Sequence, residues 1–318
     1  MAFRLDRNRS VAGAVPRIVR KQAAKAARGL DPKAPGAEGI HVARTSLKRL
    51  RGLLRLLKPE LGSHYREEER RLEKVQRALG PIRDAQVLVE TFDEHFRPKR
   101  GKKSERGNGK RGSTPNASGS GLDAIRVALE ARALSERFAA DVPERIAVAR
   151  AEFEKLRRRA ERFVPRRGKR AGGFRAIERG LESTYRRARA GRDAAYERPS
   201  SSAFHAFRKA VKYHGHHLKL LADVQPDELG PRLADSEELG DLLGKDHDLA
   251  VLAEALATLK SAFADETQYR AALDSIAREQ AALRKRAKPL AERLFAESPA
   301  EFRRLMRELF RAWRDGPQ

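Results

Sequence analysis

The sequence predicts an all-α protein that contains two copies of one helical unit. Two observations carry this prediction. Ala, Leu, Arg, Lys and Glu dominate the chain, and apolar residues recur every three or four positions, which is the period of an α-helix. In addition, residues of the first half reappear in the second half in the same order and at the same spacing. Self-similarity at a fixed distance indicates a duplicated structural unit.

The repeat keeps its register without a gap. The first-half residues His41, Arg44 and Lys48 each recur after a shift of 205 − 41 = 164 positions, as His205, Arg208 and Lys212. The same shift places Leu79-Gly80 on Leu243-Gly244, and Asp84 on Asp248. We therefore expect two tandem repeats, at residues 1–168 and 169–318.

Apolar periodicity predicts the helices of each repeat in order. Four core helices are expected in the first repeat, at 10–28, 41–58, 63–79 and 83–97, with counterparts between 174 and 262. Two helices follow each core, at 122–139 and 143–163 and at 266–288 and 299–314. Pro143 and Pro299 lie near helix starts, where a missing N–H costs little. Because helix 10–28 has a counterpart, we expect the Arg- and Ala-rich beginning of the chain to be part of the fold and not a cleaved targeting segment.

Residues 98–121 break the helical pattern. They are basic, rich in Gly and Ser, and almost free of apolar side chains. Such a segment buries too little surface to offset the entropy lost on ordering, so we expect a disordered loop.

The charge of the chain indicates an anionic partner. Lys and Arg outnumber Asp and Glu by 69 to 44, which gives a net charge of +25. That excess is self-repulsive in a compact fold, and a polyanion would offset it. The absence of cysteine excludes disulfides and thiol chemistry and fits a reducing compartment. No apolar run is long enough for a transmembrane helix.

Two equivalent helices carry cations that border the core face. In helix 41–58 these cations are His41, Arg44, Lys48, Arg51 and Arg55. The second repeat has His205, Arg208, Lys212 and Lys219, with Lys209 and His216 alongside and Gly215 in the place of Arg51. Since a helix rises about 1.5 Å per residue, the part of this row from Arg44 to Arg55 spans roughly 16 Å, which suits an extended anion. The preceding helices add the cations Arg17, Arg20, Lys21, Lys25, Arg28, Arg175, Arg179, Arg186 and Arg189.

Such a row of charges usually forms a solvated face, but it can also form a binding site. Comparison of the two repeats distinguishes these interpretations. Arg70, Arg71, Lys74 and Arg77 fall on Ala234, Asp235, Glu238 and Asp241, so that face changes sign and is interpreted as solvated. The His-Arg-Lys rows keep their sign and are interpreted as functional. Asp84 and Asp248 are expected either to cap a helix or to pair with an arginine of the row.

These motifs resemble the CHAD domain family (conserved histidine α-helical domain). The likeness rests on His-x2-Arg-x3-Lys, then Leu-Gly-x3-Asp-x2-Val, with the whole unit duplicated. The resemblance implies two four-helix bundles with pseudo-two-fold symmetry around a basic central groove. It implies binding of inorganic polyphosphate, with the two cationic rows facing each other, and a cytoplasmic location in association with polyphosphate granules. The triphosphate-processing domain of some family members is not expected here.

Three other functions stay open as alternatives. Duplex nucleic acid would suit the charge, although aromatic residues make up only 6% and fall on core positions, so stacking on single strands is poorly supported. A metal site is suggested by His214, His216 and His217 and by the run Asp246-His247-Asp248, but it is disfavoured because His216 and His217 point in different directions on a helix. An enzyme is disfavoured because residues 240–246 miss the P-loop spacing and no nucleophile–base pair is suggested. We expect no metal, no cofactor and no catalysis.

A linkage hypothesis concerns His41 and His205. Neighbouring Arg and Lys disfavour the imidazolium in the free protein, and a bound polyanion would favour it. Affinity is therefore expected to rise as the pH falls from about 8 to 6.

Overall fold

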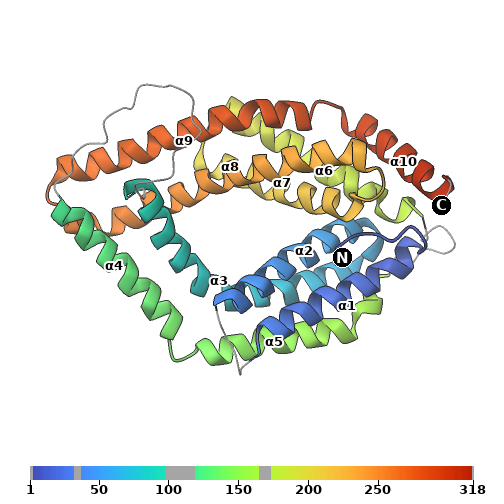
Figure 1. Cartoon of the computed structure of the whole chain (residues 1–318), viewed down its shortest axis with the longest axis horizontal. Coiled ribbons are helices and arrows are strands. Elements are labelled where there is room, and N and C mark those ends of the chain that lie inside the picture. Colours follow the sequence, from blue (N-terminus) through green and yellow to red (C-terminus); the bar gives the residue numbers. More distant parts are fainter. Residues whose placement is uncertain (1–2, 32–36, 98–118, 165–172, 317–318) are drawn as a thin grey trace.

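Figure 1 shows the fold of the chain, a computed structural model that describes residues 3–31, 37–97, 119–164 and 173–316. All regular structure in these residues is helical, as the sequence predicts. The first half contains α1 (Val11–Gly29), α2 (Ala37–Leu61), α3 (Ser63–Phe96), α4 (Gly119–Phe138), α5 (Val142–Arg158) and the short 3-10 helix η1 (Ala160–Phe163). The second half contains α6 (Arg175–Glu197), α7 (Ser201–Leu221), α8 (Pro226–Thr258), η3 (Lys260–Ala262), α9 (Glu266–Leu294) and α10 (Pro299–Asp315).

The structure repeats where the sequence repeats. Helices α1 and α6 begin 175 − 11 = 164 residues apart, α2 and α7 begin 201 − 37 = 164 apart, and α3 and α8 begin 226 − 63 = 163 apart. The same neighbours also meet in each half. Helix α1 contacts α2 and α5 as α6 contacts α7 and α10, while α3 contacts α2 and α4 as α8 contacts α7 and α9.

Helix α3 corrects one prediction. The separate helices expected at 63–79 and 83–97 form one helix that contains Pro81. A proline inside a helix removes a hydrogen bond and crowds the preceding carbonyls. Two side chains from other helices donate to carbonyls next to the proline: Arg44 Nη1 donates to the carbonyls of Leu79 and Gly80, both at 3.0 Å, and Arg145 Nε donates to that of Ala78 at 3.0 Å. In the second half the counterpart α8 is likewise continuous.

Other boundaries shift by smaller amounts. Helix α2 extends beyond 41–58 at both ends and α9 continues past 288 through Pro289. The predicted loop 98–121 ends too late, because α4 already begins at Gly119, and its remaining residues lie outside the described part of the chain. The expected boundary between the repeats at 168/169 also lies outside the described residues. Pro143 and Pro299 lie in the first turns of α5 and α10, as predicted.

Helix α2 lies at the junction of the two halves, since it contacts α1 and α3 as well as α6 and α7. Glycine permits the closest of these approaches. A Cβ on Gly180 of α6 would lie 1.7 Å from the carbonyl oxygen of Leu56, and one on Gly52 would lie 2.9 Å from Cβ of His216. The core is continuous across this junction, with Leu50, Leu54 and Leu57 fully buried among side chains of both halves.

None of the helices in the described ranges combines the length and the apolar character needed to cross a membrane.

Candidate anion-binding site

The contact between α2 and α7 brings the two cationic rows together. The strongest electrostatic neighbours of Lys48 are Arg44 on its own helix, Arg208 and Lys212 on α7, and Asp84 on α3. Lys48 and Lys212 are equivalent positions of the repeat, and so are Gly52 and His216, which touch one turn further along. Contacts between equivalent residues are what a two-fold relation between similar units produces. We call Arg44, Lys48, Arg208 and Lys212 the cation cluster.

Lys48 is in an electrostatically unfavourable environment. Burial by surrounding protein lowers the pKa of its ammonium, and the like charges of Arg44, Arg208 and Lys212 lower it further, while Asp84 opposes them. The residue as a whole is nevertheless exposed. Lys48 is therefore crowded by cations but still open to solvent, so an anion could reach it.

The two arginines of the cluster differ in how far their hydrogen bonds are used. Arg44 donates Nη1 to the two carbonyls before Pro81 and pairs Nη2 with Asp84 at 2.8 Å. Its counterpart Arg208 makes no ion pair with any described residue, and its buried Nε has no hydrogen-bond partner among them. Burial lowers the pKa of Arg208, although the carboxylates of Asp248 and Asp84 lie near enough to raise it. Arg208 therefore keeps more hydrogen-bonding capacity for a ligand.

The two equivalent aspartates join the cluster. Asp84 pairs with Arg44 and also lies near Arg208 and Lys48. The pairing alternative is thus confirmed for Asp84, whereas helix capping is wrong because Asp84 lies in the interior of α3. Burial raises the pKa of Asp248, while Arg208, Lys48 and Lys212 lower it. Both carboxylates lie where they can orient the cations without cancelling their total charge.

One neighbour of the cluster was considered from the sequence only as a possible metal ligand. His247 on α8 lies beside His205, with 3.3 Å between the two Nδ1 atoms and 4.5 Å between ring centroids. Burial and the charge of Arg208 lower the pKa of His247 to about 4, and burial with Lys209 and Arg208 lowers that of His205. Burial is thus the larger cause, ahead of the neighbouring cations that the sequence suggested. Because Arg83 occupies the position equivalent to His247, the repeat carried no signal for this histidine.

Carboxylates hold the far end of the first row. Arg51 pairs with Glu69 at 2.6 Å in a buried contact, with both side chains less than 14% exposed: 13% and 12%. Arg55 lies 3.5 Å from the same carboxylate and over the ring of Tyr213 at 4.3 Å. Gly215 occupies the position of the second half that is equivalent to Arg51. A Cβ there would lie 2.8 Å from Ser236 Oγ, which explains why this position carries no side chain.

Lysines of the second row make exposed ion pairs. Lys212 lies 3.1 Å from Asp241, and Lys219 lies 2.9 Å from Glu237. Lys209 is exposed one turn after His205. Pairs of this kind contribute little to stability, so a stronger anion can replace the carboxylate.

The predicted cations of α1 and α6 are mostly exposed, and the strongest neighbours of Lys48 do not include them. On α1, Arg20 pairs with Glu161, Arg17 lies 3.7 Å from Asp6, and the exposed remainder are Lys21, Lys25 and Arg28. On α6, Arg186 pairs with Glu182 at 2.5 Å, and the others are Arg175, Arg179 and Arg189.

The remaining histidines do not form a metal site. His214 is buried among Tyr185, Phe295 and Phe302, and burial lowers its pKa to about 3. His217 is buried too, with Nε2 at 2.9 Å from the carbonyl of Gly52, and its pKa is lowered to about 4. The described ranges hold no group of three or more metal-ligating side chains.

His41 and His216 differ in their surroundings. His41 is exposed at the start of the first row. His216 packs against Gly52, and burial lowers its pKa to about 3, so at neutral pH it adds no positive charge to the site.

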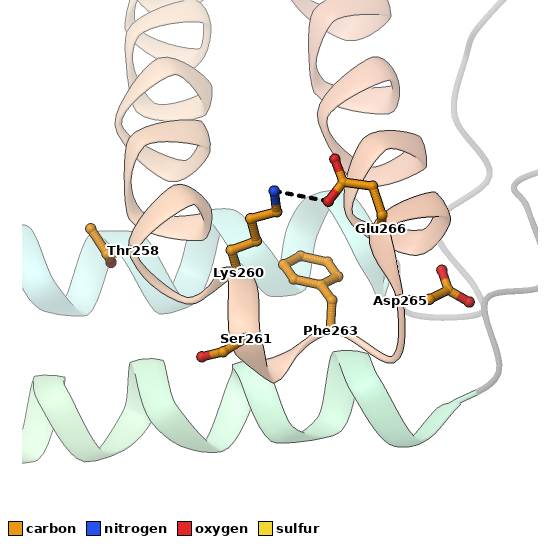
Figure 2. A pocket seen from close by; sticks show the side chains of 6 residues that line it. All are labelled: Thr258, Lys260, Ser261, Phe263, Asp265 and Glu266. Atoms are coloured by element: carbon orange, nitrogen blue, oxygen red, sulfur yellow. Dashed lines mark ion pairs between the residues drawn. The ribbon is translucent and has the colours of Figure 1, made fainter.

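Figure 2 shows a hollow at the turn between α8 and α9, and no residue of the cation cluster lines it. Lys260 and Glu266 face each other across it and form an ion pair at 2.8 Å. The other lining residues are Thr258, Ser261, Phe263 and Asp265. Its charges are mixed and its only lysine is paired, so this hollow does not match a polyanion.

Comparisons with known proteins bear on most of the chain. The model of the CHAD domain family matches residues 17–257, which include every residue of the cation cluster. Among solved structures, the crystal structure of the CHAD domain from the plant Ricinus communis matches with a TM-score of 0.57 and 18% sequence identity. That match covers 100% of this chain and 96% of the other, and at this identity it concerns the fold. No curated protein matches the chain.

Proposed function

Because the chain belongs to the CHAD domain family, we propose that it binds inorganic polyphosphate in a groove between its two halves and catalyses no reaction. The proposal includes a cytoplasmic location beside polyphosphate granules. One observation of this chain carries it: three other cations, from two helices, crowd around Lys48. Like charges held this close are unfavourable by themselves, and a bound anion would turn the repulsion into attraction.

The surroundings of Lys48 support the groove. Protein atoms desolvate its ammonium, yet the residue is exposed. A side chain on the floor of a groove has both properties, because protein surrounds it on most sides and solvent reaches it from one. A linear anion lying along such a floor would meet cations of α2 on one side and of α7 on the other.

The ion pairs of the site indicate which cations a phosphate would engage first. Lys48 and Arg208 make no ion pair with the described residues, and Lys212 is held only by an exposed pair with Asp241. Arg51 is different, because displacing Glu69 from it would leave a buried carboxylate without its partner. Breaking a buried pair is costly. We therefore propose that the chain contributes Arg208, Lys48 and Lys212 as principal contacts and Arg51 as a minor one.

The aromatic side chains of the two cationic helices do not favour single-stranded nucleic acid at this site. Phe204 and Phe207 are buried in the core, and the ring face of Tyr213 is covered by Arg55. Base stacking needs exposed rings among the cations. Duplex DNA needs no rings, so it is the competitor that the binding experiment must include.

Calorimetric titration with long-chain polyphosphate, duplex DNA and ATP, all at one salt concentration, tests the proposal. We expect polyphosphate to bind most tightly. The double variant Lys48→Glu/Lys212→Glu should abolish this binding, whereas Arg70→Glu/Lys74→Glu on the exposed face of α3 should leave it nearly unchanged. Equal or tighter binding of DNA would overturn the ranking, and equal losses in the two double variants would refute the assignment of the site.

A further inference from the structure

Helix α4 has apolar side chains on two opposite faces. One face packs toward α3 through the buried residues Ile125, Leu129 and Ala133. The opposite face exposes the large side chains Val127 at 63%, Leu134 at 54% and Phe138 at 71%. A helix that is apolar on opposite sides is expected to be covered on both. In the described chain, one other large hydrophobic side chain is exposed, Val251 on α8.

The exposed face has the spacing of a coiled-coil seam. Its apolar residues follow each other at intervals of three and four positions: Ala124, Val127, Ala131, Leu134 and Phe138. This is the a/d pattern of the heptad repeat, which places side chains in one line for packing against another helix. We call these five residues the α4 seam.

No described part of the chain covers the α4 seam. Helix α4 contacts α3, α5 and η3, and Figure 1 shows it at the periphery of the molecule. The segment 98–118, which joins α3 to α4, contains no Val, Leu, Ile, Met or aromatic residue. Helix α9, which follows α8 as α4 follows α3, instead exposes polar and charged side chains such as Asp274, Arg278 and Lys285. The apolar seam is therefore particular to α4 and is not a general property of this part of the fold.

We propose that the α4 seam is a self-association surface, on which a second copy of this chain places its own α4 in the antiparallel direction. The charges beside the seam favour this occupant. Glu130 and Arg137 share one flanking heptad position. When Val127 lies opposite Phe138 of the second copy, Glu130 lies beside Arg137 of that copy, and the two-fold symmetry repeats the pair. Parallel packing of the two helices would place neither Glu130 nor Arg137 opposite a charged residue.

The intramolecular contacts of these two residues leave them free to pair. Glu130 pairs with Arg126 at 2.9 Å, and its side chain is 45% exposed. Exposed pairs of this kind are worth little and re-form easily. Arg137 lies over the ring of Phe138, with its guanidinium carbon 5.4 Å from the centroid, and is exposed at the end of the seam.

The size of the seam determines the strength of the association. From Ala124 to Phe138 the seam extends about 21 Å along the helix, which is two heptads. An interface of this length falls at the low end of protein–protein interfaces, below about 1,200 Å². Two chains of charge +25 also repel each other. The dimer is therefore weak, and it strengthens with salt, because the Debye length falls from about 10 Å at 0.1 M to about 3 Å at 1 M.

Sedimentation equilibrium over a range of protein concentrations, at low and high salt, tests this proposal on the full chain. We expect the average mass to rise from monomer toward dimer with concentration, more steeply at high salt. Leu134→Glu should weaken association at least tenfold, because it places two carboxylates in the seam. Val251→Glu is the matched control, since it changes an exposed hydrophobic residue on another helix, and it should leave the dimer unchanged.

The charge variants test the antiparallel direction and do not depend on Leu134→Glu folding normally. Glu130→Arg and Arg137→Glu should each weaken the dimer, because each puts like charges side by side twice. The double variant Glu130→Arg/Arg137→Glu should restore it. A chain that stays monomeric at every concentration, or a dimer that Leu134→Glu leaves intact, overturns the proposal. A dimer that the single charge variants leave unchanged overturns the antiparallel arrangement.

Discussion

Replacing Lys48 by Gln separates a binding role from a structural one. The variant keeps the approximate length of the side chain and removes one charge from the cation cluster. Because burial and three like charges already lower the pKa of Lys48, the free protein loses an unfavourable charge. We therefore expect the variant to bind polyphosphate more weakly while its thermal midpoint, measured without anion, does not fall.

The expected size of the binding loss follows from the contacts. A hydrogen bond to a charged group contributes about 1.5–3 kcal/mol, so its loss weakens binding about 10- to 150-fold at fixed salt. The salt dependence gives a second number. With about 0.7 per contact, as in single-stranded polyanions, the four cations of the cluster predict a slope of log K against log salt near −2.8, and three predict about −2.1.

Isothermal titration at several salt concentrations measures both quantities, and calorimetric unfolding without anion measures the thermal midpoint. Lys74→Gln is the control, because Lys74 is an exposed lysine of α3 that makes no ion pair with the described residues. If Lys48→Gln kept the slope of the wild type, or if Lys74→Gln lost as much affinity, the assignment of Lys48 as a phosphate contact would be refuted.

Three further predictions concern buried histidines and the junction of the halves. The pKa of His214 is about 3 in the folded protein, against 6.5 for the free side chain, so the stability that neutral His214 contributes is complete above pH 6.5 and is lost as the pH falls. The wild type should therefore lose about 2 kcal/mol of stability through this histidine between pH 7.5 and pH 5, and His214→Leu should not show this loss. Equal pH profiles of the two proteins in urea unfolding would contradict this. The pKa values of His205 and His247 are lowered in the free protein, and a bound polyanion favours their protonated forms. Polyphosphate affinity should therefore rise as the pH falls from 8 toward 5, by up to about tenfold per pH unit for each proton taken up. Titrations of the double variant His205→Asn/His247→Asn should show a flatter pH profile. Gly180→Ala should destabilise the fold by about 1–3 kcal/mol or more, because the added Cβ would overlap the carbonyl of Leu56. An unchanged melting temperature would show that α2 and α6 do not pack this closely.

The α3 helix shows why one boundary could not be predicted from the sequence. Pro81 predicts an interruption, because its own backbone lacks a donor and crowds the turn before it. The helix nevertheless continues, and Arg44 and Arg145, which lie 81 − 44 = 37 residues before and 145 − 81 = 64 residues after Pro81, donate to the three carbonyls just before the proline. A local pattern contains no information about donors that arrive from such distances.

The candidate site divides in the same way. The repeat singled out Arg44, Lys48, Arg208 and Lys212, and the structure places these four side chains near one another, as expected where equivalent positions of two copies face each other. It did not assign His247 to this group, because the equivalent position holds an arginine. Sequence spacing also treated Arg51 as equal to Arg44, although a carboxylate of α3 occupies Arg51 in a buried pair.

The amino-acid sequence by itself determined the helical class, the duplication and the cations that recur, since these depend on the period of the helix and on residue identity at a constant spacing. Tertiary structure alone decided which of those cations lie together, which are already neutralised, and which apolar face of α4 remains uncovered. The physical reason is that charges and apolar surfaces act through distance in space. Lys48 and Lys212 are 212 − 48 = 164 residues apart in the chain, but they are close neighbours in the fold.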